Sequence, residues 1–237
     1  MRNFLKLIIL SVTFLSCEDT KKEKQTPVVK KNSVVEKTIE KVEKPVKDST
    51  AFDFNETVKL SDKTLEAFLT VYGKNNPERK VTLETTYGNI VLELYTDTPL
   101  HRAHFIYLVK NGYLSTTAFH RTLNDFIIQG GNSDRSTTSK MRGEMGKYTI
   151  PAEIKYQHNR GALSAAKEYR DNPDDRSSAF EFFIVQGQNG AHHLNKNYTV
   201  FGRVISGMST VDKIAALETD GSEWPLENVF IKAVISD

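Results

Sequence analysis

The chain of 237 residues is 38% hydrophobic and 26% charged, which is enough for one sizeable core plus an extension. Its 32 basic and 30 acidic residues are mixed along the chain and give a net charge of +2, so no basic footprint for nucleic acid is present. The sequence has no run of the ~20 apolar residues that a membrane-spanning helix needs.

Residues 1–17 have the pattern of an export signal. Arg2 and Lys6 give a basic start, residues 7–15 form an apolar stretch too short to span a bilayer, and Phe14-Leu15-Ser16-Cys17 follows. A small residue before a cysteine at this place resembles a bacterial lipobox, although Phe14 departs from its usual leucine. We therefore predict a lipoprotein signal peptide, with Cys17 as the lipidation site that anchors the chain to a membrane.

Cys17 is the only cysteine of the chain, which excludes an intramolecular disulfide. The alternative to lipidation is an incidental cysteine inside an ordinary, cleaved signal peptide. Residues 18–55 follow as a predicted disordered tether, because residues 18–50 contain no Leu, Phe, Tyr or Trp with which to bury apolar surface. A weak helix built on the valines of this stretch is the alternative there.

Residues 56–79 are expected to hold a short accessory helix packed against the outside of the main domain. Ser61 is a plausible N-cap and Gly73 a plausible stop. The apolar residues between them have helical spacing: Leu65, Phe68, Leu69 and Tyr72.

Two alternating runs, residues 81–86 and 90–95, flank Tyr87-Gly88-Asn89 and predict a β-hairpin. Thr98-Pro99 then begins a helix that Asn111-Gly112 ends. His101 and His104 lie one turn apart in it, but a metal site would need further ligands, so we expect them to be polar residues on the helix surface and predict no bound metal.

Residues 119–131 combine apolar positions with Arg121, Phe126 and Gln129, and we predict one buried strand. Side chains of a regular strand alternate between faces, which would separate Arg121 from Phe126. Asn124-Asp125 has the chemistry of a turn or a bulge, and a one-residue bulge there would return the later residues to the first face. A guanidinium, a phenyl ring and a carboxamide would then share one surface, suited to a small apolar ring beside a polarised amide.

The second half of the chain predicts mostly strands. We expect a long surface loop over residues 132–160, a strand of small residues over 161–166, and a polar insertion over 168–178 with a turn at 172–175. Residues 180–185 predict a strand, Gly207-Met208 begins a helix that ends near Leu217, and residues 229–235 alternate as a closing strand.

Several of these segments, in this order, resemble the motifs of the cyclophilin-type peptidyl-prolyl cis/trans isomerases. They are FHRTLNDFIIQGG from Phe119, GALSAA from Gly161, FEFFIV from Phe180 and VFGRV ending at Val204. The likeness implies a mainly β fold over residues 80–237: a closed, eight-stranded antiparallel barrel capped by two helices, here with the extra N-terminal helix and the tether. It also implies prolyl isomerase activity on proline-containing polypeptides without a cofactor, in a chain that we expect to be a monomer.

The resemblance assigns roles to particular residues. Arg121 would stabilise the twisted X-Pro bond, Phe126 would seat the proline ring, and Gln129 would hold the substrate carbonyl and orient Arg121. The predicted substrate-binding residues are His120, Ile127, Ala166, Glu181, Phe183, Leu194 and Tyr198, with the alternative for His120 of a structural hydrogen bond. Residues 161–166 would receive the peptide as an added strand.

This sequence departs from the family pattern at Lys167, Glu181, His193 and Tyr198, where Asn, Gln, Trp and His are common. Glu181 cannot donate a hydrogen bond when ionised, so contacts made through the usual amide would change. We predict an isomerase that assists folding of exported proteins at the bacterial envelope, facing the periplasm or the cell surface. A peptide-binding or chaperone module with little turnover is the main alternative, and a surface adhesin is a third.

Overall fold

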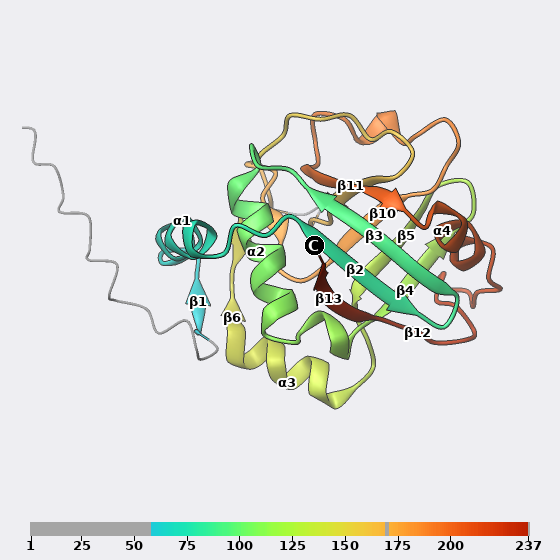
Figure 1. Ribbon diagram of the computed structural model, residues 1–237, viewed down its shortest axis with the longest axis horizontal. Coiled ribbons are helices and arrows are strands. Elements are labelled where there is room, and N and C mark those ends of the chain that lie inside the picture. The colour runs from blue at the N-terminus through green and yellow to red at the C-terminus, as the bar shows by residue number, and fades with distance from the viewer. Residues whose placement is uncertain (1–57, 169–170, 237) are drawn as a thin grey trace, which may run out of the picture. The chain divides into compact units, whose positions relative to one another are not determined.

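A sheet that closes on itself organises the computed structural model, which describes residues 58–168 and 171–236 (Figure 1). The predicted signal peptide, Cys17 and the tether of residues 18–55 lie outside the described residues. The strands of the sheet, in their spatial order, are β12 (Val229–Phe230), β4 (Ala118–Leu123), β5 (Ile127–Asn132), β10 (Phe182–Val185), β8 (Ala162–Ala165), β11 (Val200–Ser206), β3 (Gly88–Leu94), β2 (Lys80–Thr85) and β13 (Lys232–Ser236).

The first and last strands of this order close the barrel. β12 pairs with β4, and β13 pairs with β2, while only Ile231 separates β12 from β13 along the chain. The single closing strand predicted for residues 229–235 is therefore two short strands that change partner at Ile231, whose N–H donates to the carbonyl of Thr117. All pairs in this sheet are antiparallel, which confirms the predicted barrel.

The predicted first hairpin is formed by β2 and β3. Thr85 lies opposite Gly88, and alternate side chains of both strands are buried. Because every second residue faces the core, Val81 and Leu83 of β2 meet Ile90, Leu92 and Leu94 of β3 inside the barrel. The alternation of apolar and polar residues therefore predicts both the two strands and the face that each strand buries.

Two helices cap the ends of the barrel, as expected. α2 (Pro99–Lys110) lies at one end and α4 (Met208–Ala215) at the other (Figure 1). The hydroxyl of Thr98 makes no capping bond to α2; instead the N–H groups of Leu100 and His101 donate to the carboxylate of Glu153. A carboxylate at this end also interacts favourably with the helix dipole.

The accessory helix α1 (Leu65–Asn75) packs against α2, and its predicted boundaries were wrong at both ends. Ser61 belongs to β1 (Leu60–Ser61), which pairs in parallel with β6 (Gly146–Lys147), and Thr64 precedes the helix. Gly73 lies inside the helix. A Cβ at this position would come within 2.9 Å of the Cβ of Ala103 on α2. Glycine thus allows the two helices to approach closely rather than ending one of them.

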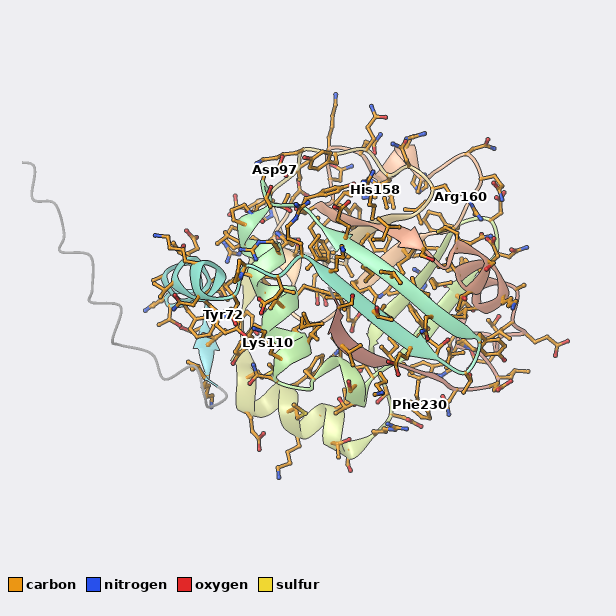
Figure 2. All side chains as sticks on the ribbon, in the orientation of Figure 1. Tyr72, Asp97, Lys110, His158, Arg160 and Phe230 are labelled. Atoms are coloured by element: carbon orange, nitrogen blue, oxygen red, sulfur yellow. The ribbon has the colours of Figure 1, made fainter. Side chains whose placement is uncertain are left out.

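Rings and polar side chains complete the contact between α1 and α2. The rings of Tyr72 and Tyr107 meet edge to face with centroids 5.3 Å apart. Lys110, at the end of α2, donates to the side-chain oxygen of Asn76 at 2.6 Å. Tyr72 and Lys110 are labelled in Figure 2.

The stretch predicted as a long loop, residues 132–160, holds a further helix. This helix is α3 (Ser136–Met145), and only Thr138 and Met145 of it are buried, so it has no apolar face to reveal it in the sequence. Two short strands, β7 (Thr149–Ile150) and β9 (Ser177–Ser178), pair with each other, and short 3₁₀ helices span Leu114–Thr116 and His192–Leu194. No helix within the described ranges is both long and apolar enough to cross a bilayer.

His101 and His104 are buried, so the prediction that they lie on the helix surface was wrong. The ring of His101 bridges Glu153, at 2.7 Å from Nδ1, and the Ser177 hydroxyl, at 2.9 Å from Nε2. Nε2 of His104 lies 3.0 Å from the hydroxyl of Tyr148. Burial, with a small contribution from His101, lowers the pKa of His104 to about 3, so its ring is neutral in the folded chain.

We predict that His104 makes the fold less stable in mild acid. The unfolded ring takes up a proton below its usual pKa of ~6.5 while the folded ring stays neutral, so stability is full above that pH and falls toward pH 3. Between pH 7 and pH 5 the unfolding free energy of the wild type should fall by about 2 kcal/mol more than that of His104→Asn. Urea titrations of both proteins at the two pH values measure this, and equal losses would contradict it.

Candidate active site

The stretch predicted as one bulged strand is a β-hairpin, formed by β4 and β5. Asn124 and Asp125 form its turn, with Asp125 in the left-handed conformation at φ 58°, and the N–H of Phe126 donates to the carbonyl of Leu123 at 3.2 Å. The chain reverses here because Asn and Asp tolerate such turns. Of the turn and the bulge that the sequence allowed at Asn124-Asp125, the structure therefore has the turn, and Arg121 and Gln129 lie directly opposite each other across the two strands.

A pocket of about 330 Å³ opens beside this hairpin. It is lined by nine of the predicted site residues: Arg121, Phe126, Ile127, Gln129, Ala166, Glu181, Phe183, Leu194 and Tyr198. Lys167, Glu168 and Ser178 complete the lining. Residues from β4, β5, β10 and the segments around β8 and β11 are thus brought together by the order of the strands.

The floor of the pocket is apolar and well packed. Ile127, Phe183 and Tyr198 are buried in one hydrophobic cluster, with Phe126 and Leu194 half-buried at its edge. The rings of Phe183 and Tyr198 meet edge to face with centroids 5.8 Å apart. A ring of the size of proline would therefore meet a fixed apolar surface here.

A buried histidine supports this floor from behind. The ring of His158, labelled in Figure 2, stacks on Phe183 with centroids 5.9 Å apart. Its Nδ1 lies 3.0 Å from Oδ1 of Asn195 and its Nε2 lies 3.0 Å from the Ser164 hydroxyl. Burial lowers the pKa of His158, which keeps the floor uncharged near neutral pH. Nothing in the sequence analysis singled out His158, because a lone histidine in a loop carries no pattern.

Polar groups form a chain along one wall of the pocket. Nη1 of Arg121 lies 3.5 Å from Oε1 of Gln129, and Nε2 of Gln129 donates to Oε2 of Glu181 at 2.9 Å. Nη2 of Arg142 then donates to Oε1 of Glu181 at 3.3 Å. The acceptor at Glu181 fixes which way the Gln129 amide faces, so that its oxygen is directed at Arg121.

Glu181 is held by the protein on both of its oxygens. Besides Gln129 and Arg142, Nε2 of His120 lies 3.7 Å from Oε2. Burial alone would raise the pKa of Glu181, but His120 and Arg142 outweigh it and lower the pKa below its ordinary value. Glu181 is therefore ionised near neutral pH, and its first contacts are to neighbouring side chains of the wall.

Arg142 comes from α3, the helix that the sequence analysis missed. Its Nε donates to the hydroxyl of Tyr113 at 2.7 Å and its Nη2 to the carbonyl of Gly131 at 2.9 Å. Gly131 has φ 97°, and a Cβ there would lie 2.0 Å from the carbonyl oxygen of Phe180. The second glycine of the QGG motif thus lets β5 and the start of β10 meet closely enough for Arg142 to bridge them.

His120 is not among the residues that line the pocket. Its side chain is 9% exposed and lies behind Glu181, with its ring 5.6 Å from that of Trp224. Within the described residues its Nδ1 has no hydrogen-bond partner. His120 therefore lies behind the pocket wall and not at its rim, and its Nε2 approaches Glu181 only at ion-pair distance, so neither predicted role for His120 is established by a hydrogen bond.

Lys167 and His193, two of the residues that depart from the family pattern, lie at the edge of the pocket. The ammonium of Lys167 pairs with Asp175 and lies 4.7 Å from the centre of the Tyr198 ring. His193 stacks on Phe126 with ring centroids 5.3 Å apart. The turn predicted at residues 172–175 is present and carries Asp175, so the polar insertion contributes directly to the rim.

The strand of small residues cannot receive a peptide as an added strand, and that prediction was wrong. β8 lies between β10 and β11 and pairs with both. The N–H of Ala166 donates to Glu181 and its carbonyl accepts from Ser178. An added strand needs an edge with free backbone groups, and β8 is a central strand.

Comparisons with known proteins agree with this geometry. A family described as cyclophilin type peptidyl-prolyl cis-trans isomerase/CLD matches residues 80–235. The chain is 35% identical over 158 residues to peptidyl-prolyl cis-trans isomerase-like 3 of Dictyostelium discoideum, a match that covers 65% of this chain and 92% of that protein. It is 36% identical over 143 residues to a peptidyl-prolyl cis-trans isomerase of Acinetobacter baylyi, covering 59% of this chain and 73% of that protein.

A solved structure has a similar fold. It is a cyclophilin type peptidyl-prolyl cis-trans isomerase of Cryptosporidium parvum, crystallised in the presence of the dipeptide Ala-Pro. It is 28% identical to this chain, with a TM-score of 0.56, and the match covers 67% of this chain and 99% of that one.

We predict that Glu181 stabilises the wall of the site. Replacing it by alanine leaves the Gln129 amide without its acceptor and removes one of the three acceptors of Arg142, which should lower the unfolding free energy by about 2 kcal/mol. The matched control is Glu144→Ala, since Glu144 is exposed on α3 and pairs only loosely with Lys140 at 3.9 Å. Denaturant titration that finds equal stability for the two variants would contradict the prediction.

Proposed function

Because the chain belongs to the cyclophilin-type peptidyl-prolyl cis-trans isomerases, it is an enzyme of that class, and we propose that it assists the folding of exported polypeptides at the cell envelope. Cys17 holds it there through lipid, and its substrates are X-Pro bonds of chains that fold outside the cytoplasm. The export-type N-terminus and the lone cysteine support this location.

The reaction that we assign to the pocket is rotation about the X-Pro amide. This rotation takes tens to hundreds of seconds uncatalysed, because the amide loses its resonance in the twisted state. The reaction breaks no covalent bond, so the catalyst needs an apolar seat for the proline ring and a donor that favours the twisted state.

Arg121 supplies that donor. Its guanidinium is always charged, and it lies at the rim of the apolar floor with one edge directed at Gln129. As the bond twists, the lone pair of the prolyl nitrogen is released, and a cation beside it stabilises the twisted state more than the planar one. Gln129, oriented by Glu181, holds the substrate carbonyl beside the cation.

Phe126, Ile127, Phe183 and Leu194 seat the proline ring. Holding the ring still while the preceding carbonyl turns converts binding energy into rotation about one bond. The observation that carries the proposal is the joint presence, in one pocket, of this apolar floor and of the Arg121 guanidinium beside Gln129.

A peptide-binding module with little turnover is the second candidate. It is favoured by Lys167, whose ammonium lies over the Tyr198 ring and lines the pocket where the family commonly has asparagine. This candidate predicts tight binding of X-Pro peptides without acceleration of their isomerisation, so the assay below separates the two.

We predict that Arg121→Ala lowers kcat/KM for an Ala-Pro peptide by about tenfold or more, equivalent to about 1.4 kcal/mol of transition-state stabilisation. A protease-coupled isomerisation assay on the full chain in detergent measures this. Arg203→Ala is the matched control, because Arg203 lies on the barrel exterior and pairs with Glu93. If wild type binds the peptide but does not accelerate its isomerisation, the binding module is the correct function.

We predict that Cys17→Ala releases the protein from membranes. An acyl chain contributes about 0.8 kcal/mol per buried methylene, and without it no other anchor is proposed. Fractionation of cells that express either protein measures the distribution between membrane and soluble fractions. Continued sedimentation of Cys17→Ala with the membranes would contradict lipidation as the anchor.

A further inference from the structure

We propose that Glu223 is a positioning residue for Arg121, a role that rests on the proposed catalytic use of Arg121. Glu223 lies in the loop between α4 and β12, more than a hundred positions away from β4 in the sequence. Its Oε2 accepts a hydrogen bond from Nε of Arg121 at 2.5 Å. No pattern in the sequence had connected the two residues.

The ion pair between Arg121 and Glu223 is partly exposed, so it orients the Arg121 side chain but adds little to the stability of the fold. The side chains of Arg121 and Glu223 are 36% and 43% exposed, and ion pairs in water contribute little to folding. A charged hydrogen bond to Nε nevertheless fixes which edge of the planar guanidinium faces the loop. The terminal nitrogens then face the pocket and Gln129.

The backbone of Glu223 is attached to the strand that carries Arg121. The N–H of Thr122, the next residue after Arg121, donates to the carbonyl of Glu223 at 3.0 Å. Because one residue of the loop contacts both the backbone of β4 and the side chain of Arg121, the carboxylate cannot move independently of the strand. This arrangement holds the acceptor in place without help from substrate.

Glu223 also has an unfavourable backbone conformation for its residue type. Its φ is 65°, in the left-handed region that glycine and asparagine prefer. The conformation is imposed by Asp220, whose Oδ1 accepts from the N–H groups of Ser222 and Trp224 at 2.8 and 3.0 Å. A residue kept in a costly conformation beside a functional group is the pattern expected where position matters.

Together these contacts hold Arg121 from both sides. The guanidinium has five N–H donors in a rigid plane. Glu223 takes the Nε donor on the loop side, and Gln129, which Glu181 orients, lies near Nη1 on the strand side. The remaining N–H donors are on the terminal nitrogens, and their directions are fixed by the plane of the guanidinium. A tilt of this plane would therefore move them away from the reacting amide.

The test compares three variants of the full chain in the isomerisation assay. Glu223→Gln keeps an acceptor oxygen and should lose about threefold in kcat/KM, whereas Glu223→Gly keeps none and should lose about tenfold. Glycine also suits the left-handed conformation, so this variant should unfold at no lower urea concentration than wild type. The matched control is Glu227→Gln, which removes a charge from the same loop. Native Glu227 accepts a hydrogen bond from the Tyr87 hydroxyl at 2.8 Å and not from Arg121, so this variant should retain full activity.

Two further measurements distinguish positioning from a general effect. In an Arg121→Ala background, Glu223→Gly should cause no additional loss of activity, because the group that it positions is gone. In ¹H-¹⁵N spectra, the Nε–H signal of Arg121 should be protected from solvent exchange in wild type and should lose this protection in Glu223→Gly.

The outcomes separate this inference from the function on which it rests. Full activity of Arg121→Ala would overturn the proposed role of Arg121 itself. Loss of activity in Arg121→Ala, with Glu223→Gly as active as Glu227→Gln, would overturn only the role of Glu223. A further loss from Glu223→Gly in the Arg121→Ala background would likewise show that Glu223 does not act through Arg121.

Discussion

The register of the β4–β5 hairpin is the constraint on which the site depends. It sets Arg121 opposite Gln129, and a slip of one residue would turn every side chain of one strand to the other face of the sheet. The three-residue loop of Asn124, Asp125 and Phe126 between the strands fixes that register. On the other side of β5, Gly131 lets this strand pass the carbonyl of Phe180, because a side chain there would collide with that oxygen.

Around this hairpin the site has two parts, an apolar floor and a charged wall. The floor is apolar and uncharged, with the neutral ring of His158 packed behind Phe183. The wall is a line of four charged side chains and one amide that runs from Glu223 through Arg121, Gln129 and Glu181 to Arg142. The wall holds the one cation that the proposed chemistry needs, while the floor supplies binding energy that does not depend on charge.

The sequence predicted the parts of the fold that repeat a simple pattern, and missed those that depend on tertiary contacts. Alternation in residues 81–95 identified β2, β3 and their buried faces, and the ordered motifs placed nine pocket residues. The hairpin was missed because an apolar run with a polar pair in the middle fits both a bulge and a turn. α3, Arg142 and Glu223 left no signal, since a mostly exposed helix has no apolar face and an ion pair between distant segments has no local pattern.

We propose that one pocket both seats proline beside Arg121 and turns the bond before it. NMR of an Ala-Pro peptide with the full chain tests this in one sample, because nuclear Overhauser effects locate the ring and exchange spectra report isomerisation. We expect contacts from the proline ring to Phe126, Phe183 and Leu194, with cis and trans signals that exchange only when protein is present. Exchange without those contacts, or those contacts without exchange, would contradict it.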